Sequence, residues 1–339
     1  MGALKKVSLG CGGLLGLVVL GIVGVVTYAR LRSDALIHFP DTPYPAVVAS
    51  TDPEVIERGR YLVYGPAHCT QCHGDYPRSE PAKNTPTTPV TGGFEFDMGP
   101  MGRMYSANLT PDLETGIGAR TDAELARTIQ TGVLSTGKLS LMMATSVANV
   151  SNEDTAAIIS YLRSIPPVRR EIPAPDDGML SLLLLLLPLG PDLTPAPTYV
   201  PAGAEPSVAR GEYLAEHVML CAGCHSDIDL STFKPTGPPF VGGMSDPSPE
   251  PGSDMVFTPP NLTSDPEFGV TGRLDEDAFV ARIKHGRVYA FSKMPWENFQ
   301  SASEGDLRSV YRYIRSKPAS NQDPGPSYRK SSWKPGDPA

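Results

Sequence analysis

The sequence predicts an all-α protein built from two tandem copies of one small helical domain behind an N-terminal transmembrane helix. Three observations lead to this prediction: an uncharged N-terminal stretch, a set of motifs that recurs 152 residues later, and helix-start signals without the long alternating apolar runs of a sheet. A chain of 339 residues is long enough for about two domains of ordinary size.

The N-terminal segment, residues 1–35, is predicted to be a membrane anchor. Residues 7–29 carry no charged side chain, and as a helix they would rise about 35 Å, more than the ~30 Å hydrocarbon core of a bilayer. Basic residues flank the stretch on both sides, so charge alone gives no orientation. The alternative is a cleavable signal peptide, but the apolar region of such a peptide usually runs only about 7–15 residues.

The rest of the chain repeats itself, which is the signature of a duplicated domain. The matching pairs of segments are 58–62 with 210–214, 69–73 with 221–225, 108–110 with 261–263, and 161–164 with 313–316. We therefore expect two domains, residues 53–168 and 206–318. A linker at 169–205 joins them, and a tail at 319–339, rich in Pro, Ser and Lys, is predicted to be disordered.

Each copy carries helix-start signals. Thr121 followed by Glu124 is a capping-box pattern, and Gly132 is placed to end that helix. Ser151 begins the last helix of the first copy, and the second copy repeats the pattern. Three or four short helices per domain, joined by proline-rich loops, are expected.

The linker contains an unusual apolar stretch at residues 179–190, with six successive leucines before Pro188. It is too short to span a bilayer. We expect it either to pack as a strap against the two domains or to contact the membrane surface or a partner subunit, because such a run is poorly suited to a free linker.

Four of the five cysteines lie in two Cys-x-x-Cys-His sequences, the pattern for covalent attachment of haem c. Two thiols on one helical turn form thioethers with one porphyrin, and the adjacent histidine binds the iron. A redox-active dithiol would not need the histidine, and a zinc site would need the two units to meet. Two haem c groups are therefore predicted, attached at Cys69, Cys72, His73, Cys221, Cys224 and His225.

A methionine is the expected sixth iron ligand in each domain, because methionine sulfur commonly fills that position in electron-transfer cytochromes. Met294 precedes Pro295 and lies 69 residues beyond His225, and Met142 lies 69 residues beyond His73. The predicted iron ligands are thus His73, Met142, His225 and Met294. Met143 is the rival of Met142, because no proline marks the ligand in the first copy.

Covalent haem also predicts the location, because haem c is attached outside the cytoplasm. The expectation is a single-pass membrane protein with a cytoplasmic N-terminus and both domains on the periplasmic side. The net charge of −8, without a basic stripe, argues against nucleic acid as a partner. No catalytic triad, carboxylate pair or phosphate loop stands out, so an electron carrier is predicted and not an enzyme.

Both copies resemble class I cytochrome c domains. The sharper likeness is to membrane-associated cytochrome c subunits of bacterial alcohol and aldehyde dehydrogenases, and it rests on residues 105–112, on residues 115–118 and on the Arg-Gly-x-Tyr-Leu sequence before each haem motif. This resemblance implies electron transfer from a dehydrogenase subunit to quinone, a terminal oxidase or another cytochrome. Two departures are that such subunits typically carry three haem domains and that the first copy lacks the Met-Pro pair.

Two other functions stay open at this point. One is a di-haem enzyme such as a peroxidase, for which the irregular first copy is the only place. The other is a haem subunit of a respiratory oxidase complex, which the anchor and the leucine-rich stretch would dock.

Overall fold

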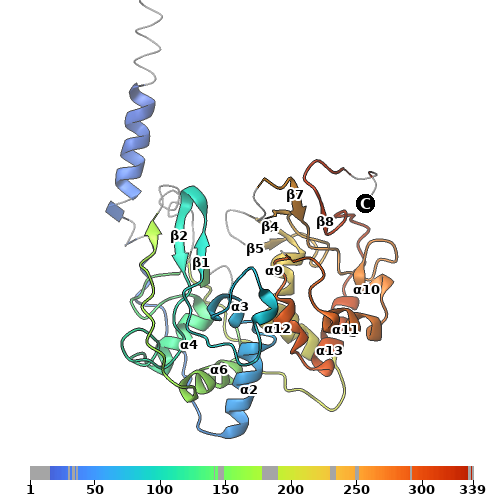
Figure 1. The fold of residues 1–339 in the computed structure, drawn as a ribbon, viewed down its shortest axis with the longest axis horizontal. Helices are drawn as coiled ribbons and strands as arrows, with labels where there is room; N and C mark the ends of the chain where they lie inside the picture. The colour runs from blue at the N-terminus through green and yellow to red at the C-terminus, as the bar shows by residue number, and fades with distance from the viewer. Residues whose placement is uncertain are drawn as a thin grey trace, which may run out of the picture.

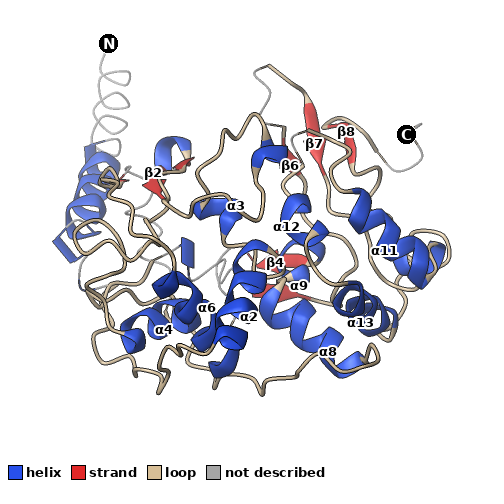
Figure 2. Cartoon of the chain, turned by 60° about the horizontal axis from the view of Figure 1, so that its bottom comes forward, coloured by secondary structure: helices blue, strands red, loops and turns tan. Residues whose placement is uncertain are grey.

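Two helical lobes lie side by side in the computed structural model, one formed by the first repeat and one by the second (Figure 1). The structure describes residues 16–29, 31–32, 35, 37–140, 142–143, 149–177, 190–229, 234–248, 252–290, 292–334 and 337. Helices joined by long loops dominate these residues (Figure 2), which confirms the predicted helical class.

The helices of the two repeats follow one another in the same order. The first repeat contains α2 (Pro53–Tyr64), α3 (Thr70–His73), the 3₁₀ turns η1 (Pro81–Lys83) and η2 (Gly99–Met101), α4 (Asp122–Thr131) and α6 (Asn152–Ser164). The second contains α8 (Val208–Tyr213), the π-turn η3 (Leu214–Val218), α9 (Cys221–His225), α10 (Val270–Arg273), α11 (Glu276–His285), α12 (Trp296–Gln300) and α13 (Glu304–Arg315).

Short antiparallel sheets correct the prediction of an exclusively α fold. They are β1 (Glu95–Asp97), β2 (Gly102–Tyr105) and β3 (Asp176–Asp177); β4 (Asp227–Asp229) and β5 (Lys234–Thr236); and β6 (Asp246–Pro247), β7 (Met255–Phe257) and β8 (Tyr328–Lys330). These strands have only two to four residues, too few for an apolar alternation of period two to stand out in the sequence.

Two stretches expected to be irregular contribute to these sheets. In the linker, Asp176 and Asp177 pair with β2 of the first repeat. In the C-terminal tail, where disorder was predicted, β8 pairs with β7 of the second repeat. The apolar stretch predicted at residues 179–190 lies outside the described residues, apart from Gly190.

The first and last helices of each repeat cross closely at a glycine. A Cβ atom on Gly59 of α2 would lie 1.9 Å from the carbonyl oxygen of Ala157 in α6, and one on Gly211 of α8 would lie 1.9 Å from that of Ser309 in α13. No real side chain tolerates such a contact, so the glycine of the Arg-Gly-x-Tyr-Leu motif sets the distance between the two helices.

The arginine of the same motif joins these helices by an ion pair. Arg58 Nε and Nη2 donate to the carboxylate of Asp154 over 2.9 and 2.8 Å. Arg210 makes the same two-point contact with Asp306 over 3.0 and 3.1 Å. A planar guanidinium matches a carboxylate in this way, which fixes direction as well as distance. Each aspartate lies in the first turn of its helix, three residues after the capping serine.

The tyrosine of the motif reaches into the other repeat. Tyr61 Oη donates to Asp306 Oδ2 over 2.6 Å, and Tyr213 Oη donates to Asp154 Oδ2 over 2.7 Å. Burial, helped by the Asp306 carboxylate, raises the pKa of the Tyr61 phenol above its ordinary value, so the phenol remains protonated at neutral pH. Each aspartate thus binds an arginine of its own repeat and a tyrosine of the other.

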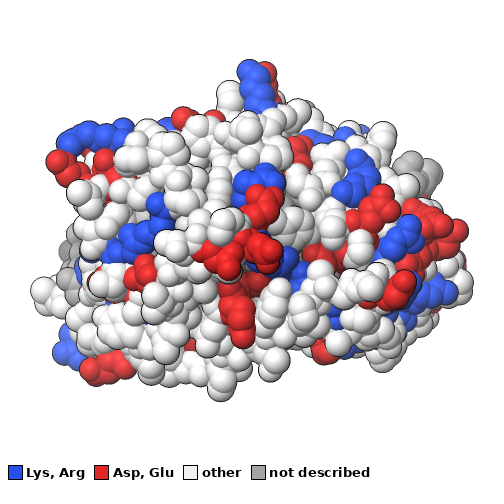
Figure 3. All heavy atoms as spheres, turned by 90° about the horizontal axis from the view of Figure 1, so that it is seen from below, with Lys and Arg blue, Asp and Glu red and all other residues white. Residues whose placement is uncertain are grey.

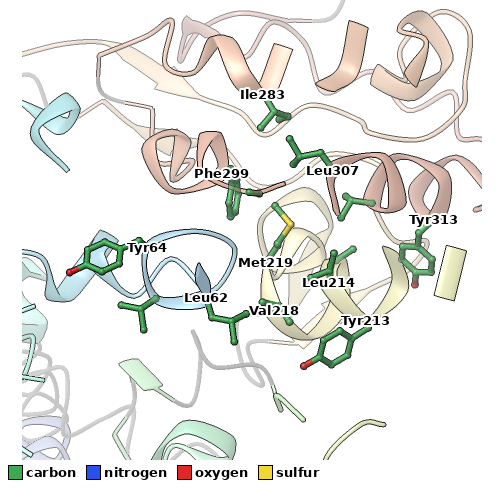
Figure 4. Packing of buried hydrophobic residues seen from close by; sticks show 14 of the residues in the cluster. Leu62, Tyr64, Tyr213, Leu214, Val218, Met219, Ile283, Phe299, Leu307 and Tyr313 are labelled. Carbon is green, nitrogen blue, oxygen red and sulfur yellow. The ribbon is translucent and has the colours of Figure 1, made fainter. Parts of the chain in front are cut away.

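A continuous hydrophobic cluster fills the junction between the two lobes. Figure 4 shows side chains of α2, η3 and α12 pointing toward one another there, among them Leu62, Val218 and Phe299. None of the three has more than 4% of its surface exposed. The two repeats therefore share one core, and this core holds the lobes together in addition to the Tyr–Asp hydrogen bonds.

The N-terminal helix corrects the predicted membrane anchor. Residues 16–29 are helical and extend away from the first lobe (Figure 1). Within the described part of the chain, no helix is both long and apolar enough to cross a membrane. The predicted anchor at 1–35 and the single-pass location are therefore wrong for these residues; residues 1–15 lie outside them.

Charged groups are mixed over the surface in the view from below. Figure 3 shows acidic and basic side chains interspersed on that face, with acidic ones gathered near its middle. That face is therefore not a uniform acidic surface.

Candidate haem-attachment sites

Both Cys-x-x-Cys-His sequences fold as a single helical turn. The first lies on α3, with Cys69 as its N-cap and His73 at its end, and the second forms α9 from Cys221 to His225. On one turn, residues three apart lie on the same side of the helix. The two thiols of each site therefore lie side by side, as attachment to one porphyrin requires.

The chain enters both turns in the same unusual conformation. His68 precedes Cys69 with a φ of 41°, and Leu220 precedes Cys221 with a φ of 57°. Non-glycine residues seldom adopt this left-handed region, because Cβ crowds the backbone. In each repeat an i→i+5 bond lies just upstream, from Ala67 N to Leu62 O over 3.0 Å and from Met219 N to Leu214 O over 2.7 Å. The duplicated sequence thus repeats its backbone in detail.

Each histidine is held by a backbone carbonyl. His73 Nδ1 lies 2.8 Å from Ala107 O, and His225 Nδ1 lies 2.9 Å from Pro260 O. Only a protonated Nδ1 can bond to a carbonyl oxygen, so Nε2 carries the free lone pair that an iron atom needs. Burial lowers the pKa of both imidazoles, which favours the neutral ligand form.

The Asn-Leu-Thr motif of each repeat fixes the carbonyl that holds the histidine. Asn108 follows Ala107 directly; its Nδ2 donates to Val168 O over 2.8 Å, and its Oδ1 accepts from Thr110 N and Oγ1 over 3.0 and 2.8 Å.

The second repeat uses Asn261, which follows Pro260. Its Nδ2 donates to Ser320 O over 2.8 Å, and its Oδ1 accepts from Thr263 N and Oγ1 over 2.9 and 2.8 Å. The function of this motif in orienting the histidine was missed in the sequence, although its recurrence was a signal for it.

The electrostatics of the thiols argue against a redox-active dithiol. Burial raises the pKa of Cys69 to about 12 and that of Cys221 to about 12. A reactive dithiol needs the opposite shift, because the thiolate is the nucleophile. Among the residues that the structure describes, no group of three or more His, Cys, Asp and Glu side chains is arranged to hold a metal ion.

Met294 lies in a tightly bonded loop between α11 and α12, partly buried against the same hydrophobic cluster as Cys221. Arg287 organises this loop: it donates to the carbonyl oxygens of Ser292 and, over 3.4 Å, of Met294. Its Nε and Nη2 also bind Glu297 of α12, each over 2.8 Å. These contacts hold the backbone of the loop that carries Met294, and Arg287 is a further residue that the sequence did not reveal.

The first repeat has no such loop among the described residues. Met142 and Met143 lie in a short helical stretch and are partly buried, and Met143 N donates to Ser140 Oγ over 3.3 Å. Residues 144–148, which follow, lie outside the described residues. The choice between Met142 and Met143 stays a prediction.

The residues present fit a haem c at each site. Each site offers two thiols on one turn and an imidazole whose Nε2 is free. The described fold is thus helical, with two Cys-x-x-Cys-His turns whose side chains could each hold a haem c.

Comparison with known proteins confirms the predicted resemblance to dehydrogenase cytochrome c subunits. The chain is 28% identical over 314 residues to "Alcohol dehydrogenase (quinone), cytochrome c subunit" of Gluconacetobacter polyoxogenes, covering 86% of this chain and 60% of that protein. It is 27% identical over 320 residues to "Gluconate 2-dehydrogenase cytochrome c subunit" of Pantoea cypripedii, covering 87% and 63%. With "Fructose dehydrogenase cytochrome subunit" of Gluconobacter japonicus it shares 24% over 293 residues, covering 83% and 55%.

The chain spans about 60% of the length of the first of these relatives. No family model matches it. The relatives are named as cytochrome subunits of dehydrogenases, which agrees with the prediction of an electron-transfer subunit that is not itself the enzyme.

Proposed function

We propose that this chain is a di-haem electron-transfer subunit that takes electrons from a dehydrogenase and passes them to quinone, a terminal oxidase or another cytochrome. The two haem-binding domains are residues 53–168 and 206–318. The observation that carries the proposal is the pair of imidazoles of His73 and His225, each bonded through Nδ1 to a backbone carbonyl and so left with a free Nε2.

Haem c, when bound, supplies one-electron redox chemistry through its iron. The residues of the chain hold the haem, orient its ligand and exclude water. The paired thiols fix each porphyrin, the Nδ1 bond keeps the histidine in one tautomer and orientation, and the surrounding hydrophobic cluster excludes water from the junction between the repeats. A redox centre that gains or loses one electron needs surroundings that are already in place, because few atoms then have to move on electron transfer.

The sixth iron ligands are proposed to be Met294 in the second domain and Met142 in the first. For Met294, the bonded loop around Arg287 and Glu297 supports the assignment. For Met142, the support is its distance of 69 residues from His73, the same as that between Met294 and His225. Replacing each methionine by leucine, one at a time, tests this. Loss of the methionine-to-iron charge-transfer absorption of one haem is expected for M294L and for M142L, but not for M143L.

The dehydrogenase partner is proposed from the relatives. The three relatives compared above are named as subunits of alcohol, gluconate and fructose dehydrogenases, so the donor proposed here is the catalytic subunit of a dehydrogenase that oxidises an alcohol or a sugar acid or ketose. With such a dehydrogenase and its substrate under nitrogen, the α-band of this protein should rise. An α-band that stays absent with every such donor would contradict this part of the proposal.

Counting haems tests the core of the proposal. Expressed in a host with cytochrome c maturation, the chain should gain the mass of two porphyrins, and the double variant C69A/C72A should gain one. A matched control is C221A/C224A, which should also gain one and keep the other haem. A wild-type mass without two porphyrins would overturn the di-haem function.

A further inference from the structure

The structure contains a direct connection from the Met294 loop of the second repeat to the Cys-x-x-Cys-His turn of the first. Helix α12 begins at Trp296, two residues after Met294. In Figure 1 this helix lies at the centre of the molecule, beside α3. Its two buried residues are Asn298 and Phe299, with 1% and 4% of their surface exposed.

The side chain of Asn298 makes its hydrogen bonds to residues of the first repeat. Its Nδ2 donates to Thr70 Oγ1 over 2.7 Å and to Tyr64 O over 2.8 Å. Its Oδ1 accepts from Asn84 Nδ2 over 3.0 Å. A primary amide has two donors and one acceptor oxygen, so every polar group of this buried side chain is used across the junction. Such a group is costly to bury without partners.

Phe299 completes the contact with the same turn. Its ring meets that of His68 edge-on, with the ring centroids 5.7 Å apart. His68 and Thr70 are the two neighbours of Cys69, so successive residues of α12 contact the chain on both sides of the first attachment thiol. His68 is also the residue with the left-handed φ of 41°, and Phe299 packs against the strained position.

At its other end α12 is bound to the loop of Met294. Trp296 N donates to Met294 O over 2.8 Å, and Phe299 N donates to Pro295 O over 3.0 Å. The path from Met294 to Cys69 thus runs through one short helix and two buried side chains. A rigid element that contacts both sites is one physical means of coupling them energetically.

The sequence of the first repeat has no asparagine at the position that corresponds to Asn298. The residue 152 positions before Asn298 is Ser146, whose side chain is shorter and has no amide; it lies outside the described residues. The Tyr–Asp hydrogen bonds are reciprocal, whereas among the described residues the Asn298 contact is made from the second repeat to the first.

We propose that Asn298 and Phe299 are positioning residues that couple the two haem sites, so that the second repeat sets the reduction potential of the first haem. Because Asn298 is bonded to Thr70, it fixes the turn that carries Cys69 and His73. This inference rests on the proposed di-haem function and adds to it the contact through which the second repeat acts on the first site.

The test compares two leucine variants on the same helix in the two-haem protein. Asn298→Leu removes the bonds to the first repeat. Gln300→Leu is the matched control, because its amide donates to Lys284 O within the second repeat over 3.0 Å. The potentials of the two haems are measured by spectroelectrochemistry, and the first haem is identified as the signal that C69A/C72A lacks.

The expected result is that N298L changes the reduction equilibrium constant of the first haem about tenfold, ~59 mV for one electron, and changes the second haem less, while Q300L leaves the first haem as it is. Equal shifts of both haems, a shift confined to the second, or no shift would each overturn the inference. If N298L does not take up haem, N298S carries the same test with the same expected order. A wild-type protein without two haems would instead refute the proposed function.

Discussion

The phenol of Tyr61 donates a 2.6 Å hydrogen bond to the carboxylate of Asp306, which lies 245 residues further along the chain, and Tyr213 donates to Asp154 over 2.7 Å in return. Residue i of one repeat contacts residue j of the other, and j contacts i. This is the pattern of an isologous dimer interface, here formed within one chain. Because the four residues recur at matching positions, both contacts come from one duplicated motif.

Removing the hydroxyl group of Tyr61 or of Tyr213 is expected to destabilise the whole chain. A hydrogen bond to a charged group contributes about 1.5–3 kcal/mol, so Y61F and Y213F should each lower the free energy of unfolding by that amount in denaturant titrations. The control is Y105F, whose hydroxyl meets the exposed carboxylate of Glu95 at 3.2 Å and should change stability by less than ~0.5 kcal/mol. Equal effects in all three variants would contradict the importance of the junction.

Loss of the Asp306 carboxylate should lower stability more than loss of an exposed ion pair. Arg210 and Asp306 expose only 2% and 3% of their side chains, and loss of one partner of a buried ion pair costs about 3–5 kcal/mol. D306A is therefore expected to lower the free energy of unfolding by this amount. E80A breaks an exposed pair, with 58% and 53% of the side chains accessible, and should cost ~0–1 kcal/mol. A cost below that of E80A would be the contrary result.

Two glycines in helices are expected to respond in opposite directions to alanine. G59A places Cβ 1.9 Å from Ala157 O, so α2 and α6 must separate, at a cost of about 3 kcal/mol or more. G305A lies in α13 with no atom within 4 Å of the new Cβ and should stabilise the helix by about 0.5–1 kcal/mol. Thermal unfolding of the two variants decides the matter, and a lower melting temperature for G305A would contradict the prediction.

The Asn-Leu-Thr motif should act on one haem at a time. N108A frees the Ala107 carbonyl that holds His73, and N261A frees the Pro260 carbonyl that holds His225. Each should lose about 1–2 kcal/mol of stability and shift the potential of its own haem more than that of the other. Redox titration of both variants checks this. If N108A shifted the two potentials equally, the motif would not be acting through its own histidine.

Stability should fall on the acid side as Glu276 takes up a proton. Hydrogen bonds from Arg312, and also from Arg308, hold the pKa of Glu276 below its ordinary value. A lowered pKa in the folded state means that the contribution is complete above the unfolded pKa of about 4.3 and is lost as the pH falls through the lower folded value.

The variant E276Q isolates the contribution of the Glu276 charge to stability. At pH 7 the wild type should be more stable than E276Q by about 1 kcal/mol, because the pair is only partly buried, and the difference should shrink as the pH falls below ~4.3. Urea titrations at several pH values measure it. A difference that does not change with pH would mean that the charge of Glu276 does not contribute.

The sequence alone was sufficient for the features that depend on local patterns. The capping box at Thr121 and Glu124 is present as predicted, because capping is decided within one turn. The helical class followed from the same signals. Two- to four-residue strands such as β7 and β8 were missed, since their pairing depends on a partner over seventy residues away.

The sites were predictable only in part. The thiols and histidines could be named because their chemistry requires one fixed spacing. Asn108 and Asn298, which help to hold them in place, act through contacts with residues 60 and 228 positions away, and no local pattern reports such contacts. The anchor was predicted from apolar composition over residues 7–29, but no helix in the described part of the chain is both long and apolar enough to cross a membrane.

The reciprocal arrangement of Tyr61, Asp154, Tyr213 and Asp306 also limits how either repeat can be altered. A single copy carries both a donor and an acceptor for its twin. A substitution of the tyrosine or the aspartate in one repeat therefore leaves a buried polar group of the other repeat without that partner, so the two copies of the motif have to be redesigned together.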